Sequence, residues 1–123
     1  MNTLPSRISS PSRRPITVTF QQLSAPRQRL VRLMQQIRFG RIEGLVVQAG
    51  SPVLDPRPRI IREIKFGVDN SPHPESAKMD FALKDQVLDM LAQLEELGDG
   101  VIRALEIQHG LPFRMTVEEE VLA

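Results

Sequence analysis

The 123-residue chain contains no cysteine. This absence excludes a disulfide scaffold, thiolate catalysis and thiolate zinc sites, and it fits a reducing compartment. Tryptophan and tyrosine are also absent, which leaves five phenylalanines as the only large aromatic side chains. With so few rings, most of them in apolar phase, we do not expect a platform on which the bases of a single-stranded nucleic acid could stack.

Long apolar runs are missing too. No stretch approaches the roughly 18 apolar residues that a membrane-spanning helix needs. The N-terminal residues lack the apolar core of a secretory signal. We therefore expect a soluble, cytoplasmic protein that makes no contact with a membrane.

Motifs for catalysis are equally scarce. The chain has no glycine-rich phosphate loop, no nucleophile elbow and no paired metal-ligand motif. His73 stands in a Pro-His-Pro linker and His109 at a hairpin turn, and neither has a partner at metal-ligand spacing. Asp85 and Asp89 fall on the polar face of an expected helix, where charged residues are ordinary. The sequence thus predicts no enzymatic activity, no cofactor, no metal ion and no small-molecule substrate.

An internal repeat is the clearest feature that the sequence does contain. The stretch 37–53 recurs, without a gap, sixty residues later at 97–113. Identical residues occupy six of the aligned pairs: Gly40 and Gly100, Ile42 and Ile102, Leu45 and Leu105, Gln48 and Gln108, Gly50 and Gly110, Pro52 and Pro112. Each copy is too short to bury a robust core alone, so the two halves are expected to pack as one unit.

Each copy predicts a helix followed by a β-hairpin. The first helix begins after Ser24 as N-cap, and its apolar stripe ends before Gly40. The second is expected to run from about Ser76 to Leu97 and to be the longer one. The hairpin strands are predicted at 41–48 and from Pro52, and at 100–108 and 112–118, with Phe113, Met115 and Val117 facing inward. Ile42 and Ile102 break the alternation just before the small residues Gly44 and Ala104, which indicates a β-bulge or burial on both faces there.

The whole chain divides into an arm, one domain and a tail. Residues 1–14 are predicted to be a disordered basic arm and 15–123 a single domain. Within that domain we expect a lead strand at 15–21, the first repeat at 24–66 with a third strand over 60–66, a linker at 67–75, the second repeat at 76–118 and an acidic tail at 119–123. The predicted fold is α+β: two duplicated helix–hairpin units packed as a pseudo-dimer, with both helices on one face of one antiparallel sheet.

The first copy resembles a known family at Arg38-Phe39-Gly40-Arg41-Ile42 and Val47-Gln48-Ala49-Gly50. These stretches are similar to the YezD-like family of short bacterial proteins, in which a helix is followed by a hairpin. The resemblance covers about thirty residues and is weaker in the second copy, where Gly98-Asp99-Gly100 replaces the aromatic-glycine step. It implies the hairpin and a bacterial origin, and it brings no activity with it because that family has none assigned.

Charge is divided unevenly between the halves. Residues 1–66 carry twelve basic and three acidic side chains, whereas 67–123 carry four basic and twelve acidic ones. Such a dipole can serve a polyanionic partner or head-to-tail pairing with another copy of the chain. Arginine outnumbers lysine thirteen to three, which suits bidentate contacts to phosphate or carboxylate.

Two functional hypotheses follow. The first is a small non-catalytic interaction or assembly module with a protein partner or self-association. The second is a protein that reads the backbone of duplex nucleic acid, in a salt-sensitive manner, through its arginine-rich half. Both hypotheses use the same candidate binding residues, which are Arg29, Arg32, Arg38, Arg41, Arg57, Arg59 and Arg62.

Overall fold

A computed structural model describes residues 17–118, which form two α-helices, two short 3-10 helices and five β-strands. In chain order the elements are η1 (Phe20–Gln22), α2 (Ala25–Ile37), β1 (Gly40–Gln48), β2 (Ser51–Val53), β3 (Arg59–Arg62), η2 (Pro74–Ala77), α3 (Asp85–Leu97), β4 (Gly100–Gln108) and β5 (Leu111–Glu118). The five strands make one antiparallel sheet, so the α+β class predicted from the sequence is confirmed.

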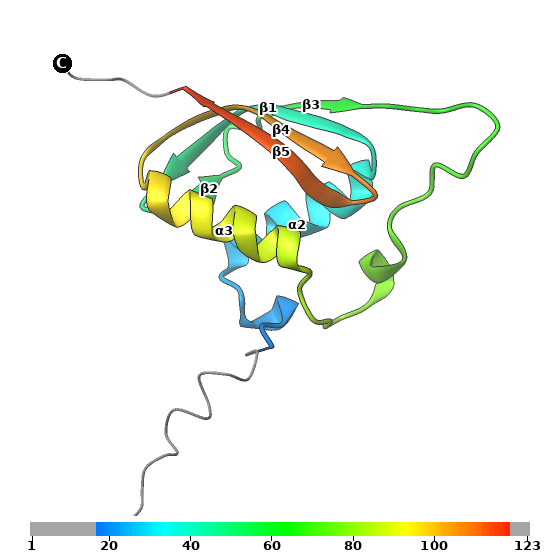
Figure 1. Ribbon diagram of the computed structural model, residues 1–123, viewed down its shortest axis with the longest axis horizontal. Coiled ribbons are helices and arrows are strands. Elements are labelled where there is room, and N and C mark those ends of the chain that lie inside the picture. Colours follow the sequence, from blue (N-terminus) through cyan, green and yellow to red (C-terminus); the bar gives the residue numbers. More distant parts are fainter. Residues whose placement is uncertain (1–16, 119–123) are drawn as a thin grey trace, which may run out of the picture.

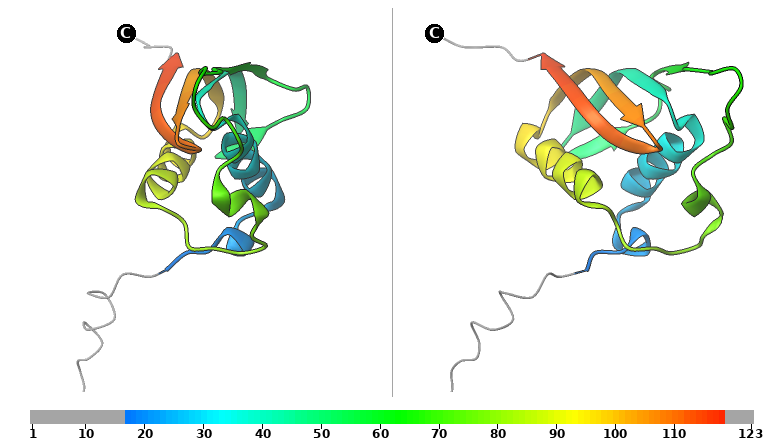
Figure 2. Two further views of the ribbon diagram at one scale, coloured as in Figure 1. Left: turned by 90° about the vertical axis from the view of Figure 1, so that its right-hand side faces the viewer. Right: turned by 45° about the vertical axis from the view of Figure 1, so that its right-hand side comes forward.

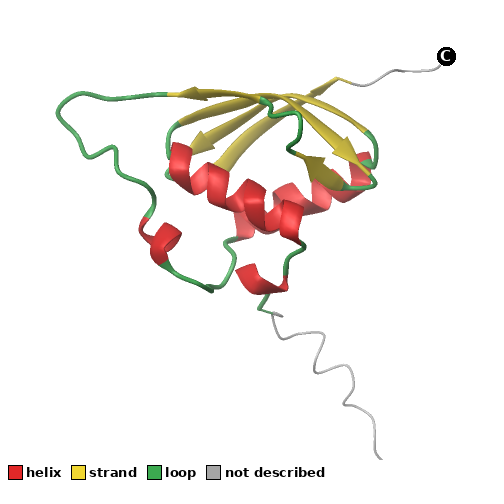
Figure 3. Cartoon of the chain, turned by 180° about the vertical axis from the view of Figure 1, so that it is seen from behind, coloured by secondary structure: helices red, strands yellow, loops and turns green. Residues whose placement is uncertain are grey.

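The sheet has the strand order β2-β1-β4-β5, and β3 pairs with β1 beside β2. Both α2 and α3 lie against the same face of this sheet (Figure 1). A view from behind shows the two layers, with no helix of the described chain on the other face (Figure 3). The candidate binding arginines are therefore distributed over the helix layer, the open sheet face and the loops that join them.

The core lies between the two layers. The helices contribute apolar stripes whose buried members include Leu30, Val31 and Met34 from α2 and Met90, Leu91 and Leu94 from α3. The inner sheet face contributes Ile42, Leu45, Val47, Ile102, Leu105 and Ile107, each at most 1% exposed. Removal of this apolar surface from water is the main force that holds the helices on the sheet.

The irregularity predicted near Gly44 and Ala104 is present. The β4–β5 register shifts by one residue between Ile102 and Ala104, which is a β-bulge in β4. In β1 the corresponding residue Gly44 has φ +71°, a conformation that glycine adopts without strain. These irregularities let Ile42 and Leu45 both face the core although they are three residues apart.

Matching positions of the two halves meet each other. In the β1–β4 ladder Ile42 pairs with Leu105, and Leu45 pairs with Ile102. Beyond the ladder, the backbone N–H of Gly50 donates to the carbonyl of Gly98 at 2.8 Å. The N–H of Gly110 donates likewise to the carbonyl of Arg38 at 2.9 Å. Each hairpin turn is thus attached to the end of the other half's helix.

The lead strand predicted at 15–21 is wrong for the residues that the structure describes. Thr19 makes a single isolated bridge with Ala82, and the chain then turns into η1. The alternation that suggested a strand has another cause, because the buried ring of Phe20 stacks on Phe81 at a centroid distance of 5.0 Å. Two backbone hydrogen bonds, Phe20 N–H to Phe81 and Leu83 N–H to Val18, complete this contact.

The second helix is shorter than predicted. It begins at Asp85 rather than near Ser76, and like α2 it has 13 residues. The segment before it forms η2 and then runs extended across α2, where Arg32 and Gln21 bind its backbone. These tertiary hydrogen bonds replace the helical ones that local propensity would favour.

The third strand is also shorter than predicted, because it ends at Arg62. That residue pairs with Gly40, the first residue of β1, so the sheet offers little beyond it to pair with. One further bond, from Glu63 N–H to the Phe39 carbonyl, follows before the chain leaves the sheet.

The prediction that Phe113 faces inward is also wrong, because Phe113 sits at a second bulge, in β5, and is 57% exposed.

The predicted arm at 1–14 and the predicted tail at 119–123 lie outside the described residues. Within 17–118, no helix is both long and apolar enough to cross a membrane.

Candidate interaction surfaces

The seven predicted arginines do not form one surface. They fall into four environments: the junction of α2 with η1 (Arg32), the loop after β3 (Arg38 and Arg62), the open sheet face (Arg41 and Arg59), and the space between α2 and the chain entering β3 (Arg29 and Arg57). The seven arginines therefore have different structural roles.

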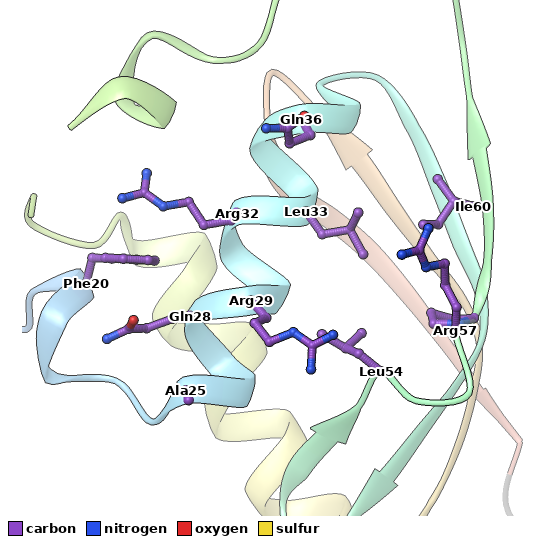
Figure 4. Close-up of a pocket in the computed structure, with 11 residues that line it drawn as sticks. Phe20, Ala25, Gln28, Arg29, Arg32, Leu33, Gln36, Leu54, Arg57 and Ile60 are labelled. Atoms are coloured by element: carbon purple, nitrogen blue, oxygen red, sulfur yellow. The ribbon is translucent and has the colours of Figure 1, made fainter. Parts of the chain in front are cut away.

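Arg32 is a clamp inside the protein. Its guanidinium donates to the side chain of Gln35 and to three backbone carbonyls, those of Glu75, Ser76 and Lys78. It also lies 4.1 Å from the ring centroid of Phe20. Figure 4 shows its side chain on the Phe20 side of α2, away from Arg29 and Arg57. With its donors used in this way, Arg32 ties the 75–78 segment to α2.

Arg38 and Arg62 hold the loop that follows β3. Arg38 donates to the carbonyl of Ser71 at 2.9 Å, and Arg62 donates to the carbonyl of Asn70 at 3.0 Å. The Asn70 side chain closes the loop, because its amide bonds both the N–H and the carbonyl of Lys65. The two arginines are consequently structural supports for residues 63–71.

Arg41 and Arg59 lie on the open face of the sheet, where they share one carboxylate. Arg41 Nε is 2.7 Å from Glu43, and Arg59 Nε is 3.8 Å from it. The hydrogen bond from Arg41 lowers the pKa of Glu43 below its ordinary value. On the next strands Arg114 binds Glu106 in the same way and lowers the pKa of that carboxyl. This face is charge-paired, which leaves little excess positive charge for a polyanion.

Arg29 and Arg57 belong to a cavity between α2 and residues 54–60, which we call the α2–β3 cavity. Its volume is about 590 Å³, and its lining continues over α2 to Phe20, Gln28 and Arg32. Figure 4 shows the two guanidinium groups extending into the space between the helix and the strand, which Leu33, Leu54 and Ile60 also line. Arg29 has one weak ion pair, 3.4 Å from Asp55. For Arg57 the described residues supply neither an ion pair nor a hydrogen bond.

Three apolar side chains that the sequence does not mark as a site are strongly exposed in the described part of the chain. Ile64, Phe66 and Val68 are 57%, 95% and 58% exposed, and we call them the apolar tip. The segment that carries them leaves the sheet after β3 and arcs away from the helices and strands (Figure 2). The sequence predicts Ile64 and Phe66 in the third strand, because they alternate with charged neighbours, and Val68 in the linker at 67–75. The available signal was Gly67 followed by Asp69 and Asn70, a turn sequence that limits how far a strand can run.

His73 caps η2 and joins it to both halves. Its Nδ1 accepts a hydrogen bond from the N–H of Glu75 at 3.1 Å, and its backbone N–H donates to the Gln35 carbonyl. Its side chain packs against Gly110, where an added Cβ atom would lie 2.9 Å from the His73 Cβ and 3.2 Å from two ring atoms. Burial lowers the pKa of His73 below its ordinary 6.5, and the neighbouring charges of Arg38 and Lys84 act in the same direction.

This pKa shift predicts a pH-dependent stability. Because folding weakens proton binding at His73, its neutral form stabilises the protein above pH 6.5, and that contribution is lost as the pH falls from 6.5 through the lower folded pKa. We expect the melting temperature of His73→Asn, which keeps an acceptor for the cap but cannot titrate, to change less between pH 7.5 and 5 than that of the wild type. Parallel curves for the two proteins would contradict this role.

Comparisons with known proteins leave the function open. No family model, no curated protein and no solved structure matches the chain. The relation to the YezD-like family consequently stays a proposal that depends on residues 38–50. No cluster of three or more His, Asp or Glu side chains able to hold a metal ion occurs in the described part of the chain.

Proposed function

We propose that the chain is a non-catalytic interaction module that binds a protein partner through the apolar tip. The observation that carries the proposal is the 95% exposure of Phe66 between two further exposed apolar side chains. Large apolar groups gathered on a surface mark sites of protein interaction, and single aromatic anchors supply much of the binding energy at interfaces. The partner would offer an apolar pocket for this ring.

The tip is supported in a way that favours binding. Asn70 bonds the backbone of Lys65 on both sides, and Arg62 and Arg38 hold the returning chain. A binding loop that is ordered beforehand loses less conformational entropy when a partner binds, so more of the burial energy appears as affinity. Glu63 and Asp69 flank the apolar residues, and they suit a partner whose pocket has a basic rim.

We further propose that the two halves are duplicated helix–hairpin units packed as a pseudo-dimer. The support is reciprocal pairing. Ile42 pairs with Leu105, and a shift of sixty residues from each half to the other turns this pair into Ile102 and Leu45, which are also paired. The same shift exchanges the two hydrogen bonds between glycine N–H groups and helix ends. A two-fold contact between identical units has this reciprocal pattern. In this scheme the segment 54–71, with the tip, is an elaboration of the first unit only.

The nucleic-acid alternative has narrower support. Arg32, Arg38 and Arg62 are engaged with backbone carbonyls, and Arg41 is paired with Glu43. Of the seven candidate arginines, those left to contact a phosphate backbone are Arg29 and Arg57, with the exposed Arg59 on the other side of the sheet. Salt-sensitive binding of labelled duplex DNA that is lost in Arg29→Glu with Arg57→Glu would favour this alternative over the apolar tip.

Replacing Phe66 by alanine is expected to weaken the binding of the partner. The partner is first captured on immobilised protein from a nuclease-treated lysate of the source organism, then purified and titrated by calorimetry. An aromatic anchor contributes about 2 kcal/mol or more, so the Kd should rise about 30-fold. Phe113→Ala, which removes a ring of 57% exposure on another face, is the matched control and should leave the Kd within about threefold.

The ring of Phe66 contacts almost nothing in its own chain, so the variant should keep the wild-type melting temperature. Equal affinities of the Phe66→Ala variant and the wild type for every captured protein would reject the tip as the binding element.

A further inference from the structure

The α2–β3 cavity has the dimensions and the lining of a ligand site. Its volume of about 590 Å³ lies within the roughly 300–1,000 Å³ typical of small-molecule pockets. The apolar side chains of Leu33, Leu54, Pro58 and Ile60 line it, and of these Leu54 and Pro58 are buried. A compact apolar group placed there would cover carbon surface that now faces solvent.

The polar groups of this cavity favour an anion. Arg29 uses one of its five N–H donors in a 3.4 Å contact with the exposed Asp55, and the described chain occupies none of those of Arg57. Both guanidinium groups point into the same space (Figure 4). A carboxylate matches the planar fork of arginine and can bind it through two parallel hydrogen bonds.

The corresponding place in the second half differs in size and in charged side chains, although the two sequences align without a gap. There Asp89 stands at the position of Arg29, and Gln93 stands at the position of Leu33. Strand β5 runs unbroken from Leu111 to Glu118, whereas the first half leaves the sheet between Val53 and Arg59. The space beside Asp89 and Gln93 measures about 170 Å³. The larger size and the pair of arginines, Arg29 and Arg57, are thus particular to the first half.

We propose that the α2–β3 cavity binds a small amphipathic carboxylate: a free molecule with one compact apolar body and one carboxylate group. The apolar body covers Leu33, Leu54 and Ile60, and the carboxylate bridges Arg29 and Arg57. The site is separate from the apolar tip, so it adds a ligand to the interaction module and stands independently of that proposal.

The test uses a fluorescent amphipathic anion, 1-anilinonaphthalene-8-sulfonate, whose sulfonate takes the place of the carboxylate, with the full-length protein. We expect saturable binding at one site, with NMR amide shifts concentrated on α2 and residues 54–60. Decanoate should displace the probe at least about tenfold better than decanol, which has the same chain and no charge, because a charge-assisted hydrogen bond contributes about a factor of ten.

Paired charge removals locate the site. Arg29→Gln with Arg57→Gln should weaken decanoate binding at least about tenfold. The control, Arg59→Gln with Arg103→Gln, removes the same charge from the sheet face, where these arginines pair with Glu43 and Glu118, and should leave binding within about twofold. Absence of probe binding, equal competition by decanol and decanoate, or equal effects of the two double variants would each overturn the proposal.

Discussion

Arg32→Ala is expected to lower the free energy of unfolding by about 3 kcal/mol, whereas Arg29→Ala should change it by less than about 0.5 kcal/mol. Arg32 donates to three backbone carbonyls and to Gln35, and it stacks on Phe20. Its loss removes the side-chain donor from all three carbonyls and detaches the 75–78 segment, although the Glu75 carbonyl keeps its bond from the Lys78 N–H. Arg29 is 58% exposed and makes one long ion pair, a contact that contributes little in water.

Urea denaturation of both variants measures the difference directly, and limited proteolysis should show faster cleavage within 75–84 in Arg32→Ala only. Equal stabilities would contradict the clamp.

The result also decides how a test of nucleic-acid binding must be designed. A charge reversal that includes Arg32 would disrupt the fold, so any loss of binding in such a variant would not identify a phosphate contact.

Arg29 and Arg32 cannot be distinguished from the sequence. They are three residues apart on the polar side of one helix, and each is followed by apolar core positions. The difference comes from partners more than forty residues further on, because Arg32 meets the backbone of 75–78. Propensity and periodicity report on neighbours within one or two turns, so such a contact leaves no local trace.

The hairpins were predictable for the opposite reason. Strand β4 occupies 100–108 as expected, since its alternation and its flanking glycines are local signals. The start of α3 and the end of β3 were not predictable, because both are set by distant segments. The chain before α3 is held on α2, and β3 ends where its partner β1 begins. Pattern analysis cannot locate an element boundary that depends on the length of another strand.

The candidate sites were even harder to predict from the sequence than the element boundaries. Ile64 and Phe66 have the alternation of a strand, and only the absence of a pairing partner places them in solvent. The α2–β3 cavity combines residues of α2 with residues of the 54–60 segment, and no local pattern in the sequence places that segment beside the helix. The sequence singles out Arg29 and Arg57 for their charge, and the structure adds that both line one cavity together with Leu33, Leu54 and Ile60.

Gly40→Ala is expected to lower the free energy of unfolding by about 3 kcal/mol. Gly40 has φ +151°, and a Cβ atom there would overlap the backbone carbonyl oxygen of Ile61 and lie 3.0 Å from the Cα of Arg62. Backbone cannot rotate aside as a side chain can, so β3 must separate from the start of β1. Hydrogen exchange should then accelerate at β3, and binding through the apolar tip should weaken because β3 carries the tip.

Two other glycines are matched controls. Gly44→Ala places a Cβ in open space at φ +71°, so it should cost only the backbone strain of about 1 kcal/mol. Gly100 is aligned with Gly40 in the repeat, but a Cβ there would meet only the movable side chain of Leu97, at 3.1 Å or more. Gly100→Ala should therefore cost less than about 1 kcal/mol. Equal losses at Gly40 and Gly100 would contradict the close approach of β3, because of these two glycines only Gly40 pairs with that strand.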